Sequence, residues 1–337
     1  MEKKIKIAIN GLGRIGRASF KIALDNPFLQ IVAVNDLGDL PTIVHLLKYD
    51  SIYGKWGEEI KIKGSYLEIR GEKILVCSEK DPGKLPWKEL DVDIVLESTG
   101  VFRDDSAKLH LKAGAKRVII SAPPKSPDIP TYILGVNEDK IDIKKDLVIS
   151  NSSCTSNCLA PVVKVLDDNF VLDKGVFTTI HAYTNDQKIL DLPHKDLRRA
   201  RAANLNIIPT TTGAATSVIE VLPHLKNRLT GIAIRVPVPI VSLIDFAGVF
   251  KKPISRDAIN DQFKKASSTQ LKGVLDTTEE PLVSSDFKQN RYSSIVDLSL
   301  TSVQDNLAKV VAWYDNEWGY SCRYIEMAEY IGKKLIL

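Results

Sequence analysis

Gly11-Leu12-Gly13-Arg14-Ile15-Gly16 follows an apolar, β-branched run over residues 4–10 and opens a helical pattern over 14–24. Glycines in a G-x-G-x-x-G spacing between a strand and a helix are typical of a dinucleotide-binding fold. The first glycine allows a tight turn, the second lets the backbone approach a pyrophosphate, and the third lets the helix pack on the strand. The pyrophosphate is then expected at the helix N-terminus, where backbone N–H groups are unpaired.

An acidic residue at the end of the next strand indicates which dinucleotide is bound. Asp36 follows the β-like run 29–35 and lies 20 residues after Gly16. A carboxylate at this place accepts hydrogen bonds from both hydroxyls of the adenosine ribose, and it repels a 2′-phosphate. The pattern therefore predicts NAD rather than NADP, against the alternative of a glycine-rich turn that binds no ligand.

The first 150 or so residues alternate β-branched runs with helical segments such as 14–24 and 106–113. This alternation predicts a parallel sheet covered on both faces, which is a Rossmann-type α/β fold. Two short runs joined by Gly64-Ser65, at 59–63 and 66–69, predict an inserted antiparallel hairpin. The expected parallel strands are 4–10, 29–35, 74–77, 94–97, 117–121 and 147–150.

The pattern changes after residue 152, where longer β runs predict a second α+β domain with a mixed or antiparallel sheet. We expect a Rossmann domain over 1–152, a catalytic domain over 153–317, and an amphipathic helix over 318–337 that packs back on the first domain. The stretch 183–209 is long, basic and poor in pattern, as functional loops often are. The expected strands are 175–182, 230–236, 241–250, 293–299 and 307–314, with helices over 213–221 and 254–268.

Composition excludes several classes of protein. The chain has 337 residues, 46 basic and 42 acidic side chains, and a net charge of +4, which is too balanced to predict a dedicated nucleic-acid role. No apolar run approaches the roughly 20 residues that a membrane span needs, and the start leads into a strand too short for a signal peptide. Four cysteines make no disulfide framework and show no zinc-type pairing, so we expect a cytoplasmic protein without a metal.

Cys154 stands where a strand over 147–150 ends and a helix begins. The partial positive charge of a helix N-terminus favours thiolate, so we expect a lowered pKa and a reactive thiol. His181 ends the β-like run 176–180, 27 residues further on, and a histidine on a neighbouring strand can serve as the base. The alternative is a buried structural cysteine, which we favour for Cys158 on the same helix face. The pair Cys154 and His181 predicts covalent thiol chemistry.

Seven stretches carry a family pattern: AINGLGRIGR (8–17), ESTGVF (97–102), SNSSCTSNC (150–158), HAYTNDQ (181–187), PTTTGAA (209–215), RVP (235–237) and WYDNEWGY (313–320). With them the chain resembles a phosphorylating glyceraldehyde-3-phosphate dehydrogenase of the bacterial, NAD-preferring type over essentially its whole length. The resemblance implies NAD-dependent oxidation and phosphorylation of glyceraldehyde 3-phosphate through a cysteine thioester, and a homotetramer.

The resemblance also implies roles for single residues. Cys154 matches the nucleophile and His181 the base. Positions that match the pockets for inorganic phosphate and for the substrate's phosphate are Ser153, Thr155, Thr184, Arg199, Thr212, Gly213 and Arg235. Positions that match cofactor contacts are Gly11, Gly13, Arg14, Ile15, Gly16, Asp36, Lys80, Thr99, Ser121 and Asn316. Arginine suits phosphate because its planar fork donates two parallel hydrogen bonds.

Two positions depart from the commonest family pattern. Lys80 stands where arginine is usual, which puts one adenine contact in doubt, and Thr216 replaces a frequent lysine. Leu192-Pro193 resembles the NAD-preferring version of the loop 183–209 and agrees with Asp36.

Three other functions remain alternatives. They are erythrose-4-phosphate dehydrogenase, an NADP-linked enzyme working in the biosynthetic direction, and, from another class, an RNA-binding or adhesion protein.

Overall fold

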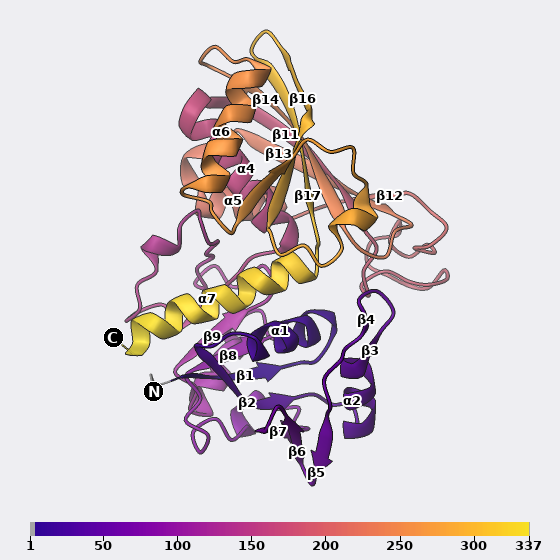
Figure 1. Cartoon of the computed structure of the whole chain (residues 1–337), viewed down its shortest axis with the longest axis vertical. Coiled ribbons are helices and arrows are strands. Elements are labelled where there is room, and N and C mark those ends of the chain that lie inside the picture. The colour runs from indigo at the N-terminus through magenta and orange to yellow at the C-terminus, as the bar shows by residue number, and fades with distance from the viewer. Residues whose placement is uncertain (1–3, 337) are drawn as a thin grey trace. The chain divides into compact units, whose positions relative to one another are not determined.

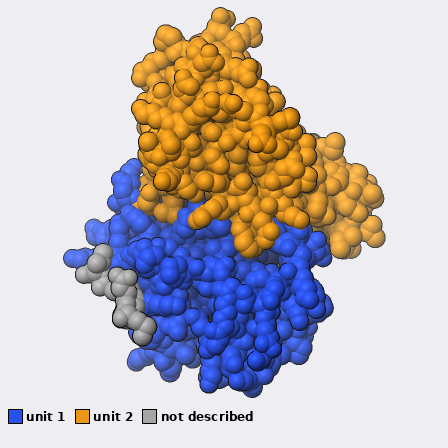
Figure 2. Space-filling view, viewed as in Figure 1, with its two compact units in different colours: residues 1–132, 139–152, 321–337 blue, residues 133–138, 153–320 orange. Residues whose placement is uncertain are grey.

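The computed structural model describes residues 4–336 and divides into two compact units, shown in blue and orange in Figure 2. Unit 1 extends to Tyr132 and adds 139–152 and the residues from Ser321 on, whereas unit 2 comprises 133–138 and 153–320. Residues 1–3 and 337, which the expected ranges 1–152 and 318–337 include, lie outside the described residues.

An eight-stranded sheet forms the centre of unit 1, in the order β10-β9-β8-β1-β2-β7-β6-β5 (Figure 1). The strands from β10 to β7 are parallel, and β6 and β5 continue the sheet as the expected antiparallel hairpin. The strands are β1 (Ile5–Asn10), β2 (Leu29–Asn35), β5 (Lys61–Lys63), β6 (Tyr66–Ile69), β7 (Glu72–Cys77), β8 (Ile94–Glu97), β9 (Arg117–Ile120) and β10 (Val148–Ser150). The order reverses at β1, between β2 and β8, and such switch points are where α/β sheets bind ligands.

Helices complete unit 1, together with a separate two-stranded hairpin of β3 (Tyr49–Asp50) and β4 (Gly54–Lys55). The helices are α1 (Arg14–Leu24), α2 (Leu40–Lys48), α3 (Leu109–Lys112) after a 3-10 turn over Asp105–Lys108, and α7 (Trp318–Ile336). The expected helix over 106–113 is thus part 3-10, and α2 is not predicted from the sequence. Tyr324 of α7 donates a hydrogen bond of 2.7 Å to the carbonyl of Ile119 in β9, which ties α7 to the sheet.

A mixed seven-stranded sheet forms unit 2, in the order β12-β13-β11-β14-β17-β16-β15. Its strands are β11 (Leu172–Ala182), β12 (Ile208–Thr210), β13 (Leu229–Val236), β14 (Ser242–Phe250), β15 (Leu275–Thr278), β16 (Ser294–Gln304) and β17 (Leu307–Tyr314). The helices α4 (Cys154–Phe170), α5 (Ala214–Val221) and α6 (Arg256–Ser268) cover one face of this sheet and share its apolar core (Figure 1). The two sheets confirm the expected fold class, with a parallel Rossmann-type sheet in unit 1 and a mixed sheet in the α+β unit 2. Within residues 4–336, no helix is long and apolar enough to cross a membrane.

Candidate active site and dinucleotide pocket

A cavity of about 400 Å³ opens at the carboxyl ends of β1, β2 and β8 in unit 1. It is lined by Asn10, Gly11, Gly13, Asn35, Asp36, Leu37, Glu79, Lys80, Ser98, Thr99, Val101 and Phe102. The position is the switch point of the parallel sheet, where the backbone turns from β1 into α1. Five of the residues expected at the cofactor line it: Gly11, Gly13, Asp36, Lys80 and Thr99.

The three glycines of the turn meet three different constraints. Gly11 has a φ of +92°, and a Cβ there would lie 2.9 Å from the backbone nitrogen of Thr99. A Cβ on Gly16 would lie 1.9 Å from the carbonyl oxygen of Gly11, so only glycine lets α1 pack this closely. Gly13 faces open space, and as N-cap of α1 it leaves the helix N-terminus without a side-chain cap. Uncapped N–H groups beside an open glycine fit the pyrophosphate of NAD.

Backbone donors hold the Asp36 carboxylate at the edge of this cavity. Leu12 N–H donates to one carboxylate oxygen (2.7 Å) and Gly38 N–H to the other (2.8 Å). Each oxygen keeps a second lone pair, which a ribose hydroxyl can use. The position and orientation of Asp36 therefore fit the adenosine ribose of NAD.

The remaining cofactor candidates do not line the cavity. Arg14 pairs with Asp50 at 2.5 Å, and Ser121 donates its N–H to the carbonyl of Glu97. Asn316 belongs to unit 2, where its Oδ1 accepts a hydrogen bond of 3.1 Å from the Ser242 hydroxyl. Ile15 is half-buried in α1 and Gly16 is buried beneath the turn. Asn10 and Asn35 line the cavity but were missed, although each ends a parallel strand and such ends point to a site.

In unit 2, α4 begins at Cys154 as the sequence predicts. Ser153 is its N-cap and accepts a hydrogen bond of 3.1 Å from Ser156 N–H. Ser152, just before the cap, has a φ of +59°, an uncommon backbone conformation for a residue with a side chain. This sharp entry places a half-buried thiol in the first turn of the helix.

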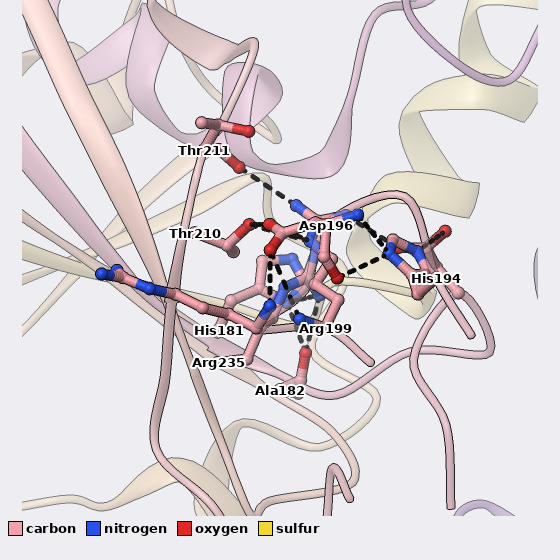
Figure 3. Close-up of polar contacts among 10 residues, drawn as sticks. His181, Ala182, His194, Asp196, Arg199, Thr210, Thr211 and Arg235 are labelled. Carbon is pink, nitrogen blue, oxygen red and sulfur yellow. Dashed lines mark hydrogen bonds and ion pairs between the residues drawn. The ribbon is translucent and has the colours of Figure 1, made fainter. Parts of the chain in front are cut away.

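His181 and Arg235 face each other because of strand register. They are directly paired residues of the parallel strands β11 and β13, so their side chains share one face of the sheet. His181 Nε2 lies 3.5 Å from Cys154 Sγ. Arg235 Nη1 lies 2.8 Å from His181 Nδ1 (Figure 3). The structure therefore brings the expected nucleophile, base and one expected phosphate ligand into one cluster.

Hydrogen bonds define the state of His181. Its Nδ1 lies between the carbonyl of Ala182 at 2.6 Å, which only accepts, and Arg235 Nη1 at 2.8 Å, which only donates. The shorter of the two contacts favours the tautomer with the proton on Nδ1. Burial, and after it the charge of Arg235, lowers the pKa of His181 to about 3, so the ring is neutral at pH 7. The lone pair of Nε2 then faces the Cys154 thiol and can accept its proton.

The expectation of a lowered thiol pKa is wrong for this structure. Desolvation raises the pKa of Cys154, and the charge of Arg235 and the contacts with Thr155 only partly oppose this rise. The expectation rested on the helix N-terminus, which favours the thiolate and lowers the pKa. Burial of the sulfur within unit 2 favours the neutral thiol and has the larger effect. Thiol and imidazole are therefore both neutral here, and the thiolate requires proton transfer to His181.

A buried chain of hydroxyl groups holds the first turn of α4 against the sheet. Tyr314 of β17 is 1% exposed, and its hydroxyl lies 2.9 Å from that of Thr155 and 2.8 Å from that of Thr179. Thr155 follows Cys154, and Thr179 lies two residues before His181 on the same strand face. One tyrosine thus fixes the helix that carries the thiol relative to the strand that carries the base.

The two arginines expected at phosphate differ in their partners. Arg199 Nη1 pairs with Asp186 at 2.7 Å, and its Nε donates to Thr210 at 2.9 Å (Figure 3). Arg235 donates to the carbonyl of Ala182 at 2.9 Å, but its buried Nε has no hydrogen-bond partner. No carboxylate among residues 4–336 pairs with Arg235, and a cation in such surroundings is a natural site for an anion.

The other expected phosphate ligands are placed as follows. Thr212 accepts a hydrogen bond of 3.2 Å from Ala214 N–H at the start of α5, and Gly213 is the N-cap, with open space where a Cβ would be. Thr184 lies half-buried just after β11. The hydroxyls of Ser153 and Thr155 are engaged inside unit 2, as cap and as partner of Tyr314. Cys158, one turn after Cys154, is buried in the apolar core.

Comparisons with known proteins agree with this arrangement. The family model for the glyceraldehyde 3-phosphate dehydrogenase NAD binding domain matches residues 5–105, and the model for the C-terminal domain of the same family matches residues 153–316. The "Glyceraldehyde-3-phosphate dehydrogenase" of Geobacillus stearothermophilus is 54% identical over 333 residues, which cover 98% of this chain and 99% of the relative.

Two further relatives extend this result. The "Glyceraldehyde-3-phosphate dehydrogenase 2" of Bacillus subtilis is 50% identical over 98% of both chains. The "Glyceraldehyde-3-phosphate dehydrogenase A, chloroplastic" of Chlamydomonas reinhardtii is 50% identical over 99% of this chain and 91% of the relative. Because both family models match and about half of the residues are identical over nearly the full length, the chain belongs to the glyceraldehyde 3-phosphate dehydrogenase family.

Proposed function

We propose that this protein oxidises and phosphorylates glyceraldehyde 3-phosphate to 1,3-bisphosphoglycerate, as in glycolysis, with NAD as the cofactor and a cysteine thioester as the intermediate. The observation that carries the proposal is the approach of Cys154 Sγ to His181 Nε2, at 3.5 Å. Beside this pair lies Arg235, which pairs with no carboxylate in the described part of the chain. Relatives that are 50–54% identical bear the name of this enzyme.

In the oxidative half of the reaction, Cys154 attacks the aldehyde carbon and forms a thiohemiacetal. His181 accepts the thiol proton at Nε2, in the tautomer whose Nδ1–H is directed at the Ala182 carbonyl. It returns this proton to the oxygen of the new thiohemiacetal, which leaves Nε2 free to accept again. NAD bound at the glycine turn of unit 1 would supply the hydride acceptor for the oxidation of the thiohemiacetal carbon. His181 assists by taking the hydroxyl proton, and Cys154 then carries a thioester, which keeps the acyl group activated.

In the second half, inorganic phosphate attacks the thioester and releases the acyl phosphate and the Cys154 thiolate. We assign Arg235 and Thr184 to the phosphate group of the substrate. The attacking phosphate is assigned to Arg199, Thr212 and Gly213, with Ser153 and Thr155 contributing backbone N–H groups at the start of α4. Among residues 4–336, Arg235 has no counter-ion to displace, whereas Arg199 must share its charge with Asp186.

For the cofactor we assign the pyrophosphate to the turn of Gly11, Gly13 and Gly16, with Arg14 and Ile15 at the start of α1. Asp36 is assigned to the adenosine ribose and favours NAD over NADP. Lys80, Thr99 and Ser121 complete the assignment around the adenosine half, and Asn316 is assigned to the nicotinamide amide. The Ser242 hydroxyl donates to Asn316 Oδ1, which leaves the Asn316 amide N–H groups to donate to the carboxamide.

We further propose that residues 1–152 with helix 318–337 serve as the NAD domain and 153–317 as the catalytic domain of a cytoplasmic homotetramer. The loop 183–209 supports the assembly, because it exposes apolar side chains such as Ile189 (79%) and Leu197 (82%). Light scattering at micromolar concentration tests the tetramer. A monomer would leave this apolar surface without a partner.

The experiment that tests the function is a steady-state assay with glyceraldehyde 3-phosphate, using NAD or NADP, each with and without inorganic phosphate. We expect NADH formation that depends on phosphate and a clear preference for NAD. Cys154→Ser should lower the rate by up to about 10⁶-fold, whereas Cys158→Ser, one turn away, should keep most of it. A rate near wild type in Cys154→Ser would contradict the mechanism. Phosphate-independent turnover of erythrose 4-phosphate, or a preference for NADP, would favour one of the two competing enzymes.

A further inference from the structure

Glu97, the last residue of β8, is a fully buried carboxylate beneath the dinucleotide pocket of unit 1. Four donors converge on it. Asn10 Nδ2 lies 2.5 Å and His110 Nε2 3.0 Å from Oε2. The backbone N–H of Thr99 lies 2.8 Å from Oε1, which also accepts from the Thr99 hydroxyl. The carboxylate therefore joins three chain segments at one point.

The protonation of this cluster follows from its partners. Trp87 Nε1, which only donates, lies 3.0 Å from His110 Nδ1, so the ring proton of His110 is on Nε2 and is donated to Glu97. All four contacts of Glu97 are thus donors, and each carboxylate oxygen accepts two of them. No lysine or arginine among residues 4–336 pairs with it. A buried carboxylate without a cation beside it is costly to desolvate, so this arrangement is not explained by stability alone.

What Glu97 orients is the surface of the pocket. Asn10, whose Nδ2 is held by Glu97, accepts a hydrogen bond of 2.7 Å at Oδ1 from Asn35 Nδ2. Asn35 Oδ1 in turn accepts from Glu79 N–H at 2.9 Å. Asn10, Asn35 and Glu79 all line the cavity. A change in the direction of the Asn10 amide would therefore reverse donors and acceptors along this row.

The second segment that Glu97 orients is the turn over residues 98–101. Thr99 donates twice to Glu97, and its hydroxyl oxygen accepts from Val101 N–H at 3.0 Å. The turn packs so closely on Gly11 that a Cβ there would lie 2.9 Å from Thr99 N. Glu97 thereby fixes the wall of the pocket that faces the glycine turn.

We propose that Glu97 is a positioning residue of the NAD site, whose buried carboxylate holds Asn10 and the 98–101 turn in the orientation that binds the adenosine half of the dinucleotide. It acts through these residues and touches no reacting atom. The inference rests on NAD as the cofactor and not on the chemistry at Cys154.

The test is Glu97→Gln, which keeps the shape of the side chain but replaces one acceptor oxygen by an N–H donor. At least one of the four converging donors must then turn away. We expect the Kd for NAD, measured by titration calorimetry, to rise at least about tenfold. The Kd for ADP-ribose, which lacks the nicotinamide, should rise by the same factor. The kcat at saturating NAD should stay within about twofold of wild type, because the cysteine site is unchanged.

Asp93→Asn is the matched control. Asp93 precedes the same strand, is 4% exposed, and accepts from Lys6 N–H (2.8 Å) and Lys116 Nζ (2.7 Å), but it does not line the pocket. Thermal unfolding without ligand should show that both variants lose stability. Only Glu97→Gln should bind NAD more weakly. The proposal is overturned if Glu97→Gln binds NAD within about twofold of wild type, or if Asp93→Asn weakens NAD to the same extent.

Glu97→Asp serves if the glutamine variant does not fold. It keeps the charge but withdraws the carboxylate by one methylene, so its NAD affinity should also fall, and wild-type affinity would contradict the proposal. The wild-type assay separates this inference from the proposed reaction. If the protein binds NAD but does not oxidise glyceraldehyde 3-phosphate, the proposed reaction is wrong, whereas the proposed role of Glu97 in NAD binding is unaffected.

Discussion

Replacing Tyr314 by phenylalanine should loosen the pair of Cys154 and His181 without touching either residue. The change deletes one buried hydroxyl that contacts Thr155 at 2.9 Å and Thr179 at 2.8 Å. Each such hydrogen bond contributes about 0.5–1.5 kcal/mol, so the free energy of unfolding should fall by about 1–3 kcal/mol. We assume that half of this free energy is lost from the alignment of the Cys154 thiol with the His181 imidazole. The rate of alkylation of Cys154 should then fall about twofold to tenfold, because 1.4 kcal/mol corresponds to a factor of ten in rate.

The assay is the rate of iodoacetamide labelling of Cys154, followed by mass spectrometry at constant pH, together with urea unfolding. Tyr132→Phe is the matched control, because the Tyr132 hydroxyl donates to Asp146 at 2.7 Å within unit 1. It should lose stability without a change in labelling. Wild-type labelling in Tyr314→Phe, or equal slowing in Tyr132→Phe, would refute the link between the hydroxyl chain and the thiol.

Three further predictions follow from the geometry. Gly16→Ala should strongly reduce the yield of folded protein, because its Cβ would lie 1.9 Å from Gly11 O, whereas Gly13→Ala should fold normally and show a raised Kd for NAD by calorimetry. Asp36→Ala should raise the ratio of kcat/KM for NADP to that for NAD at least about tenfold, and an unchanged ratio would remove Asp36 from the ribose site. The pKa of folded His181, about 3, lies below its ordinary 6.5, so stability from this group is complete above pH 6.5 and falls by about 1.4 kcal/mol per pH unit below it. Arg235→Met should raise the pKa of folded His181, so the loss should level off at a higher pH, which unfolding measured at intervals from pH 7.5 down to pH 3 would show.

Local patterns predicted most of the elements but not how side chains meet. The strands over 29–35 and 94–97 and the helix over 14–24 have the predicted limits, because apolar periodicity and the glycine turn are local signals. The helix over 40–48 was missed, although Asp39 caps it and Pro41 stands in its first turn, because its apolar pattern is short. The match of the chain to its family could be recognised from quoted motifs, whereas the placement of single side chains could not.

Side-chain contacts that depend on how strands pair could not be predicted from the sequence. His181 and Arg235 are 54 residues apart and meet only because β11 and β13 pair in parallel. For the same reason the expected thiol pKa was wrong, since desolvation of Cys154 comes from elements far along the chain. Asn10 and Asn35 each end a parallel strand, but their hydrogen bonds to Glu97 and to each other join segments that are far apart in the sequence and could not be predicted from it.

The difference between the two arginines follows from the same register. Arg199 carries its own counter-charge in Asp186, so an anion that binds there shares the guanidinium with a carboxylate that is 51% exposed. Arg235 has no such carboxylate among the described residues, and its Nη1 lies 2.8 Å from the ring of His181, the proposed acceptor of the thiol proton. A phosphate dianion at Arg235 would therefore supply the missing counter-charge and, by the same Coulomb term, raise the pKa of His181. If Arg235 holds the phosphate of the substrate as proposed, substrate binding would make His181 a stronger base.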